Sequence, residues 1–303
     1  MNSTNTYCIA ELPLRITFAD SQQNSAALLP SFEPFRTEDN GITDDNIFFH
    51  LTVDDNTQPV QKEECERIST VDTGNGDTIV DIKHDGGYQF IIKDIDGNSC
   101  CLLITDKDFR DCQCALNGNY FMRTFGLNNA LMLIFAFAGS RKDLTLVHAS
   151  LVRNDGWGYA FIAKSGTGKS TQVSMWLRHI PNCDLMNDDN PIIRLIDGKA
   201  FIYGSPWSGK TPCYRNVKAP LGAITRIVRD EENFVEKVGP IEAFAQILAS
   251  CSSMKWDITI FDNICKIITR IIETTPNYNL HCRPDKEAAL VCREAISRGE
   301  KCK

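Results

Sequence analysis

Hydrophobic and polar positions alternate in short runs through the first third of the chain, as they do in β-strands that bury one face. The runs are rich in β-branched, aromatic and aliphatic residues and cover residues 7–18, 47–53, 78–84, 88–95 and 100–105. Aspartate and glycine at 85–87 and 96–98 separate the last three runs, and glycine supplies the positive φ that tight hairpins need. We therefore predict an antiparallel meander over residues 78–105 and a loop over residues 54–77.

The pattern changes to helical spacing at Tyr120. Apolar residues recur every three or four positions up to Gly139, which predicts a mostly buried helix over 120–139. Strands and helices then alternate. The remaining predicted strands cover residues 144–152, 159–163, 183–187, 192–196, 200–203, 221–229 and 278–282, and the remaining predicted helices cover 169–179, 241–250, 257–272 and 285–298.

Length and charge narrow this picture. A chain of 303 residues is long enough for two domains. We expect an α/β protein, α+β overall, with a β-rich N-terminal domain of unknown role at 1–118 and a second domain at 119–303. With 32 Lys and Arg against 39 Asp and Glu, the net charge is −7, so a nucleic-acid polymer is a poor candidate partner.

The 13 cysteines do not indicate a disulfide framework or a zinc site. Their number is odd, no C-x-x-C occurs, and residues 1–20 lack the basic and apolar segments of a secretory leader. We expect reduced thiols in a soluble, cytoplasmic protein. The longest apolar run, residues 130–139, is shorter than the roughly 20 residues that a membrane span needs, so we expect no membrane partner.

Two segments resemble phosphate-binding loops. Residues 204–211 satisfy G-x-x-x-x-G-K-[ST] at every position, whereas residues 163–170 have Ala163 in place of the first glycine. A phosphate loop must join a strand to a helix, because its backbone N–H groups and the helix N-terminus together bind the anion. Pro206 and Pro212 prevent a regular helix from starting at Lys210. The strand before Ala163 and the helix after Gly168 favour the second segment.

This loop predicts the nucleotide site, with ATP and Mg²⁺ as cofactors. Lys169 would reach the β- and γ-phosphates, and the Ser170 hydroxyl would reach the metal. The residues expected to bind the nucleotide are Ala163, Lys164, Ser165, Gly166, Thr167, Gly168, Lys169, Ser170 and Thr171.

A carboxylate must accompany such a loop, to orient the metal or to accept a proton. Asp188 and Asp189 follow one short strand after the loop helix, where an α/β sheet brings a strand end beside the phosphates. The same residues could form a solvated turn. His148 lies in an apolar strand before the loop, where a lone histidine is more often structural.

Together, His148, the loop at 163–170 and the Asp188-Asp189 pair resemble the C-terminal catalytic domain of HPr kinase/phosphorylase and its related kinases. They are similar, more distantly, to ATP-dependent PEP carboxykinase. In that family a histidine-bearing strand precedes the phosphate loop and an Asp-Asp pair follows the loop helix. The resemblance covers residues 144–230 and implies a P-loop domain of this kind with C-terminal helices.

The resemblance also implies roles. Lys169 would polarise the β- and γ-phosphates, Asp189 would act as general base on an acceptor hydroxyl, and Asp188 and His148 would orient or tune that base. The implied reaction is ATP-dependent transfer of phosphate to a serine of a protein or peptide. The N-terminal third carries no match, so HPr itself is not implied as the acceptor.

Two other functions stay open. The chain could be a nucleotide-binding module without transfer activity, or a PEP-carboxykinase-like enzyme acting on a small molecule. The segment 204–215, with Trp207, Lys210 and Arg215, is either a solvent loop anchored by a buried tryptophan or a source of cations near the site. We interpret Arg226 and Arg229 as charges on an exposed strand face, and self-association of the chain remains open.

Overall fold

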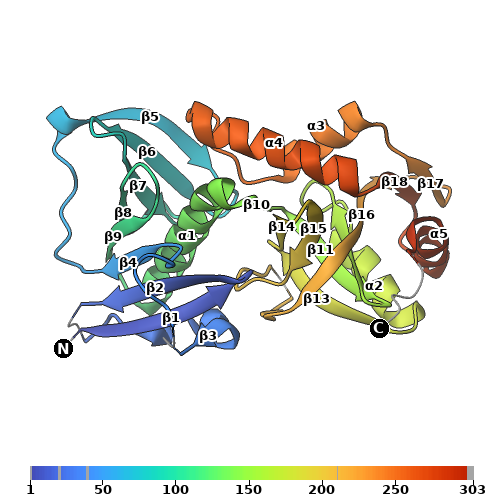
Figure 1. The fold of residues 1–303 in the computed structure, drawn as a ribbon, viewed down its shortest axis with the longest axis horizontal. Helices are drawn as coiled ribbons and strands as arrows, with labels where there is room; N and C mark the ends of the chain where they lie inside the picture. Colours follow the sequence, from blue (N-terminus) through green and yellow to red (C-terminus); the bar gives the residue numbers. More distant parts are fainter. Residues whose placement is uncertain (1, 20–21, 39–40, 210, 299–303) are drawn as a thin grey trace. The chain divides into compact units, whose positions relative to one another are not determined.

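The computed structural model describes residues 2–19, 22–38, 41–209 and 211–298. The chain forms two compact units, Met1–Ala138 and Gly139–Lys303 (Figure 1). The predicted α/β class is confirmed: a β-rich unit comes first, and a mixed unit with a P-loop and C-terminal helices follows.

The first unit is built on one nine-stranded sheet in the order β3-β1-β2-β4-β9-β8-β7-β6-β5. The meander predicted over 78–105 is present, because β6, β7 and β8 pair antiparallel in sequence. The strands and 3-10 helices are β1 Ser3–Ile9, β2 Leu12–Phe18, η1 Ala26–Leu28, η2 Pro30–Phe35, β3 Arg36–Thr37, β4 His50–Val53, η3 Lys62–Glu64, β5 Cys65–Asp72, β6 Asp77–Lys83, β7 Tyr88–Lys93, β8 Ser99–Thr105 and β9 Asp111–Leu116.

Three features of this unit differ from the sequence-based prediction. The run 7–18 is two strands, because Ala10 and Glu11 adopt positive φ (50° and 63°) and turn the chain. The predicted loop 54–77 contains the edge strand β5, whose mostly exposed, polar residues hide the usual alternation. The strand β9 was missed because its alternating buried positions are filled by cysteines, Cys112 and Cys114.

The helix α1, Tyr120–Gly139, packs against the sheet of the first unit. Phe135 contacts Phe48 edge to face at 5.3 Å between ring centroids, and Phe137 contacts Phe90 and Phe109. The units therefore divide after Ala138 rather than after residue 118, because the buried face of this helix belongs to the first core.

The segment Tyr120–Lys142 comprises α1 and the turn after it. By its length and composition alone, this helix could cross a membrane. This corrects our estimate from the shorter run 130–139. In the structure 56% of its most apolar stretch is buried, and a buried core helix meets the same length and composition criteria.

The second unit is built on a sheet in the order β10-β14-β15-β16-β12-β11-β13, extended by β18 on β16 and by β17 on β18. Parallel pairing of β12 with β16 and of β16 with β18 forms its centre. The elements are η4 Ser140–Lys142, β10 Leu144–Leu146, β11 Ala149–Asn154, β12 Trp157–Ile162, α2 Lys169–His179, β13 Cys183–Asp189, β14 Ile192–Ile196, β15 Lys199–Tyr203, β16 Lys218–Arg229, β17 Phe234–Lys237, α3 Pro240–Ser250, α4 Ile258–Thr274, β18 Asn277–Cys282 and α5 Lys286–Ile296.

Helices cover the two faces of this sheet (Figure 1). On one face, Trp176 of α2 lies in a core with Ile227 of β16 and Leu280 of β18, and α5 joins it. On the other face, Gln246 of α3 hydrogen-bonds to Asn279 of β18. Because side chains alternate along a strand, neighbouring residues of β16 and β18 face different helices.

The predicted helices and most predicted strands of this unit are present. The run 144–152 is interrupted at Val147 and His148, which separates β10 from β11. The strand β17 was missed because its residues are mostly exposed. Among the described residues every cysteine is free, as expected.

Candidate functional site

The loop at 163–168 joins β12 to α2, which is the strand–loop–helix arrangement that phosphate binding requires. Gly166 and Gly168 adopt positive φ, +75° and +133°, and an added side chain would be strained at both positions. Behind the loop, Trp176 is buried against Phe161 at 5.5 Å between ring centroids and fixes α2 on the sheet. The packing of α2 on the sheet therefore holds both the N-terminus of α2 and the backbone N–H groups of the loop in fixed positions.

Lys169 is the first residue of α2 and is 8% exposed. Its Nζ donates to the carbonyl of Ala163 at 3.1 Å and lies 2.8 Å from His148 Nε2. Burial lowers the pKa of Lys169, while the charges of Asp189 and Asp188 oppose that shift. The ammonium group thus lies between the first residue of the loop and His148.

Asp188 lies in β13 opposite Ser150 of β11, and this register brings three oxygen-bearing side chains together. Ser170 Oγ donates to the Asp188 carboxylate at 3.1 Å, and Ser150 Oγ donates to the same carboxylate. Mg²⁺ is held in proteins by one or two carboxylates together with hydroxyl, water and phosphate oxygens, so these donors fit that ion. Within the described residues no group of three or more His, Cys, Asp or Glu could hold a metal by itself.

Asp189 follows in an unusual backbone conformation, with φ at +154°. Its carboxylate accepts from Asn190 Nδ2 at 2.8 Å and lies 3.4 Å from His148 Nε2. Burial raises the pKa of Asp189; His148 and Lys169 oppose that rise, and the neighbouring Asp188 charge adds to it. Non-glycine residues hold such a backbone only where the surroundings enforce it, and such strain is concentrated at functional sites.

His148 lies between the lysine and this carboxylate. Partial burial, followed by the charge of Lys169, lowers its pKa, so the imidazole is neutral and Nε2 accepts from the ammonium. Its backbone N–H donates to the Ser250 carbonyl at 2.7 Å, which fixes the interrupted strand to the end of α3. The structure thus brings together His148, Lys169, Ser170, Asp188 and Asp189.

The segment 204–211 is not a second phosphate loop. Its described residues, 204–209 and 211, follow β15 without starting a helix. They pack against the end of β13: Ser208 pairs with Asp189, and Ser208 Oγ donates to the Asp188 carbonyl at 3.2 Å. The buried Asn187 donates to the Trp207 carbonyl at 3.1 Å. The segment that matches the motif therefore acts as a buttress: it supports the strand end that carries Asp188 and Asp189.

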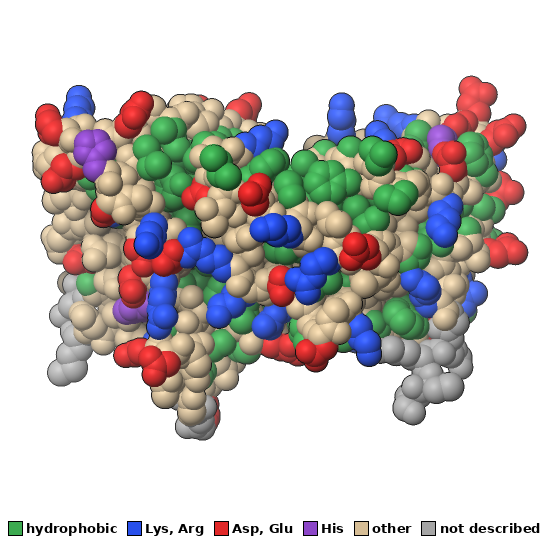
Figure 2. All heavy atoms as spheres, turned by 45° about the horizontal axis from the view of Figure 1, so that its top comes forward, with side chains coloured by type: hydrophobic (Ala, Val, Ile, Leu, Met, Phe, Trp, Pro, Cys, Tyr) green, Lys and Arg blue, Asp and Glu red, His purple; other side chains and the backbone are tan. Residues whose placement is uncertain are grey.

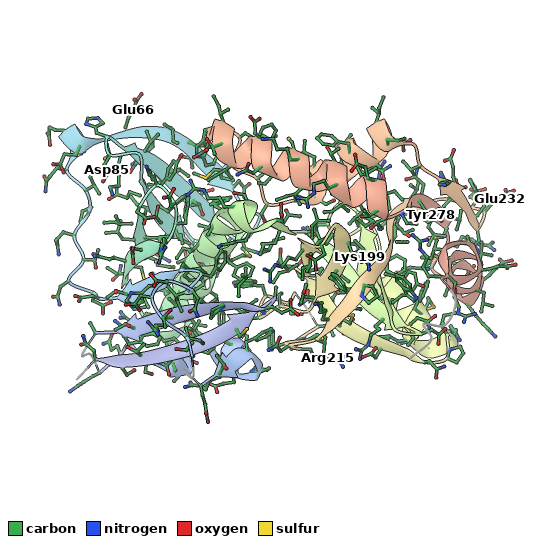
Figure 3. All side chains as sticks on the ribbon, viewed as in Figure 1. Glu66, Asp85, Lys199, Arg215, Glu232 and Tyr278 are labelled. Carbon is green, nitrogen blue, oxygen red and sulfur yellow. The ribbon has the colours of Figure 1, made fainter. Side chains whose placement is uncertain are left out.

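The buried tryptophan that the first interpretation of this segment expects is present. Trp207 is 6% exposed. Arg215, labelled in Figure 3, donates to Asp184 at 2.7 Å and is therefore paired at the other end of β13 from the Asp188-Asp189 pair. Lys210 lies outside the described residues.

Arg229 is exposed on its strand, as interpreted from the sequence, but it also makes contacts that the sequence did not indicate. Its Nε donates to the Thr167 carbonyl at 3.0 Å and its Nη2 donates to the Gly166 carbonyl. Arg229 thus supports the phosphate loop through two of its backbone carbonyls. Ser150 and Asn190 were also missed, since single polar residues in a strand or turn give no signal until the register of β11 and β13 is known.

Two cavities flank the loop. The first, of about 360 Å³, contains His148, Ala163 and Arg226 together with one side of α3. The second, of about 450 Å³, contains Gly168, Thr171 and Arg229 together with residues after β18. The sheet separates them, because Arg226 faces α3 whereas Ile227 belongs to the core under α2 and α5.

Comparisons with known proteins add little to this geometry. No family model matches the chain, and no curated protein matches it. Among solved structures, the chain is similar to the HPr(Ser) kinase/phosphatase from Coxiella burnetii, with 10% identity and a TM-score of 0.31 over 50% of this chain and 95% of that one.

Proposed function

We propose that this protein is a cytoplasmic, ATP-dependent phosphotransferase of the HPr kinase type that phosphorylates a serine of a protein or peptide. One observation carries the proposal. The lysine and serine of a phosphate loop lie against two adjacent aspartates and a neutral histidine at a single strand end. This set supplies phosphate binding, a place for the metal, and a base.

The loop would hold the nucleotide through its backbone. The N–H groups of Gly166 to Thr171 would cradle the α- and β-phosphates, and the Lys169 ammonium would exchange its contacts with Ala163 and His148 for the β- and γ-phosphates. Ser170 and Asp188 would hold Mg²⁺, which, when bound, neutralises charge on the phosphates. The second cavity, beside Thr171, would take the nucleoside.

Asp189 is the proposed general base. Its raised pKa suits a carboxylate that must accept a proton near neutral pH. In the reaction, the serine hydroxyl gives its proton to Asp189 and its oxygen forms a bond to the γ-phosphorus. The bond from that phosphorus to the β–γ bridging oxygen breaks, and phosphoserine and ADP leave.

The test is transfer of labelled γ-phosphate from ATP, in the presence of Mg²⁺, into an oriented library of serine heptapeptides. We expect Asp189→Asn to lower transfer by about 10²- to 10⁴-fold while the affinity for a fluorescent ATP analogue is retained. Asp197→Asn, in the exposed turn between β14 and β15, is the matched control. Binding of ATP without transfer to any peptide would favour a nucleotide-binding module, and nucleotide consumption with oxaloacetate would favour a carboxykinase-like enzyme.

A further inference from the structure

The cavity on the α3 side of the phosphate loop is not used by the steps described so far. It has a volume of about 360 Å³ and is bordered by His148, by loop residues Ala163, Lys164 and Ser165, by Arg226, and by α3. His148, which borders this cavity, lies 3.4 Å from the carboxylate of Asp189, so one side chain separates the cavity from the proposed base. We therefore expect the acceptor hydroxyl to approach Asp189 from the α3 side of the phosphate loop.

The α3 wall of the cavity is fixed to the segment that precedes His148. Val147 pairs with Cys251 just after α3, and Ser252 N donates to the Leu146 carbonyl at 3.2 Å. On the far wall, Glu242 accepts from Gln246 at 2.8 Å and from Asn279 at 3.1 Å. Whatever binds in the cavity is thus held in a constant position relative to His148.

The charge in the cavity is mainly positive. Arg226 and Lys164 are both exposed, and in the part of the chain that the structure describes neither side chain forms an ion pair or hydrogen bond. Glu242 is the carboxylate among the lining residues, and its known partners are neutral amides. Two free cations against one carboxylate favour an anionic group on the ligand.

The outer side of α3 adds an apolar strip beside these cations. Ile241 is 89% exposed, and Ala245 and Ala249 follow at intervals of four residues, so all three lie on one side of the helix. Figure 2 shows hydrophobic and basic side chains next to one another on the face that carries α3 and α4. A surface of this kind can bind a peptide through both an apolar and an acidic side chain.

We propose that this cavity is the acceptor subsite, and that it selects a peptide whose serine is flanked by an acidic residue, held by Arg226 and Lys164, and by an apolar residue on Ile241, Ala245 and Ala249. The proposal rests on the kinase function proposed above. A nucleoside is the competing occupant, but Thr171 and Gly168, which would contact the α-phosphate side of the nucleotide, line the other cavity.

Two readouts on the full-length protein test this proposal separately from the kinase function. The first is fluorescence anisotropy with two labelled serine heptapeptides that carry leucine and either glutamate or lysine next to the serine, in the presence of a non-hydrolysable ATP analogue and Mg²⁺. The second is transfer of labelled phosphate from ATP to the same peptides. We expect the glutamate peptide to bind about tenfold more tightly than the lysine peptide, as for a charge pair worth about 1.4 kcal/mol.

The Arg226→Glu variant should abolish or reverse this preference and leave the affinity for the fluorescent ATP analogue unchanged. Arg178→Glu is the matched control, because it makes the same charge change on the exposed last turn of α2, about 14 Å along the helix from Lys169. That variant should keep the parent's preference.

Each contrary outcome is distinct. Equal binding of the two peptides to the parent overturns the acceptor proposal, whether or not transfer occurs. Weaker binding of the ATP analogue to Arg226→Glu overturns it also, because the cavity would then hold the nucleotide. Selective binding of the glutamate peptide without transfer to either peptide supports the subsite and contradicts the kinase function alone.

Discussion

Lys169 Nζ lies 2.8 Å from His148 Nε2, so the ammonium of the phosphate loop donates to a neutral imidazole. His148 Nε2 also lies 3.4 Å from the Asp189 carboxylate. His148 therefore holds the phosphate-binding cation beside the proposed base, and it does so as a hydrogen-bond acceptor from Lys169 rather than as a charge.

Because His148 acts as a hydrogen-bond acceptor, the effect of replacing it should depend on whether the new side chain can accept a hydrogen bond from Lys169. Glutamine offers an amide oxygen to Lys169, whereas leucine offers none. We expect His148→Gln to keep most transfer activity and His148→Leu to lose about 10- to 100-fold in kcat, as for the loss of a hydrogen bond to a charged group. If both variants lose activity equally in the peptide-phosphorylation assay, His148 acts through its own proton.

The rate should depend on pH through Asp189. A base works when it is deprotonated, and burial raises the pKa of Asp189 above the ordinary aspartate value of about 3.9. We expect kcat/KM to rise with pH through that elevated pKa and then to level off. The acid limb should persist in His148→Gln, and its disappearance there would identify the histidine as the titrating group.

Ionised Asp189 should also lower the free energy of unfolding. Below the pKa of the unfolded chain both states are protonated and no cost exists. As the pH rises, the unfolded state loses its proton first, because the folded pKa is higher, and stability falls until the folded pKa is passed. We therefore expect Asp189→Asn to melt at a higher temperature than the parent at pH 7.5, with a gap that narrows toward about pH 4. A lower melting temperature at pH 7.5 would show that the carboxylate stabilises the fold.

The chemistry-bearing segments were largely predictable because each has a local signal. Gly166 and Gly168 mark a loop between a strand and a helix, and Pro206 and Pro212 exclude the competing motif, so the choice between the two segments needed no tertiary information. The helix 120–139 was predicted for a similar reason. Its assignment to the first unit was not, since that depends on contacts such as Phe135 with Phe48, residues far apart in the sequence.

The contacts that complete the site depend on sheet register. Ser150 reaches Asp188 only because β11 pairs with β13 in one register, and Arg229 reaches the loop only because β16 lies parallel to β12. Sequence patterns report burial and spacing within one element. Those patterns identified Arg229 as exposed, which is correct, but could not show which carbonyls it contacts.

Gly209 tests whether the segment 204–211 supports the carboxylate pair. A Cβ at this position would lie 3.1 Å from the Asp188 carbonyl oxygen and 3.2 Å from Asp189 Cβ, so an alanine must displace the strand end. We expect Gly209→Ala to lower transfer by about tenfold or more, because small shifts of a reacting group are costly. Nucleotide affinity should be kept. Gly239→Ala, where no atom lies within 4 Å, is the matched control, and equal activity of the two variants would contradict the buttress.

Arg229 contacts the phosphate loop through the carbonyls of Gly166 and Thr167. Removing these hydrogen bonds should leave the loop less ordered before nucleotide binds. We expect Arg229→Ala to weaken the affinity for a fluorescent ATP analogue by about three- to tenfold, with Arg178→Ala as the control. Hydrogen exchange of the loop amides distinguishes the cause. Faster exchange in the nucleotide-free variant indicates a lost support, whereas unchanged exchange with weaker binding indicates that the guanidinium contacts the phosphates themselves.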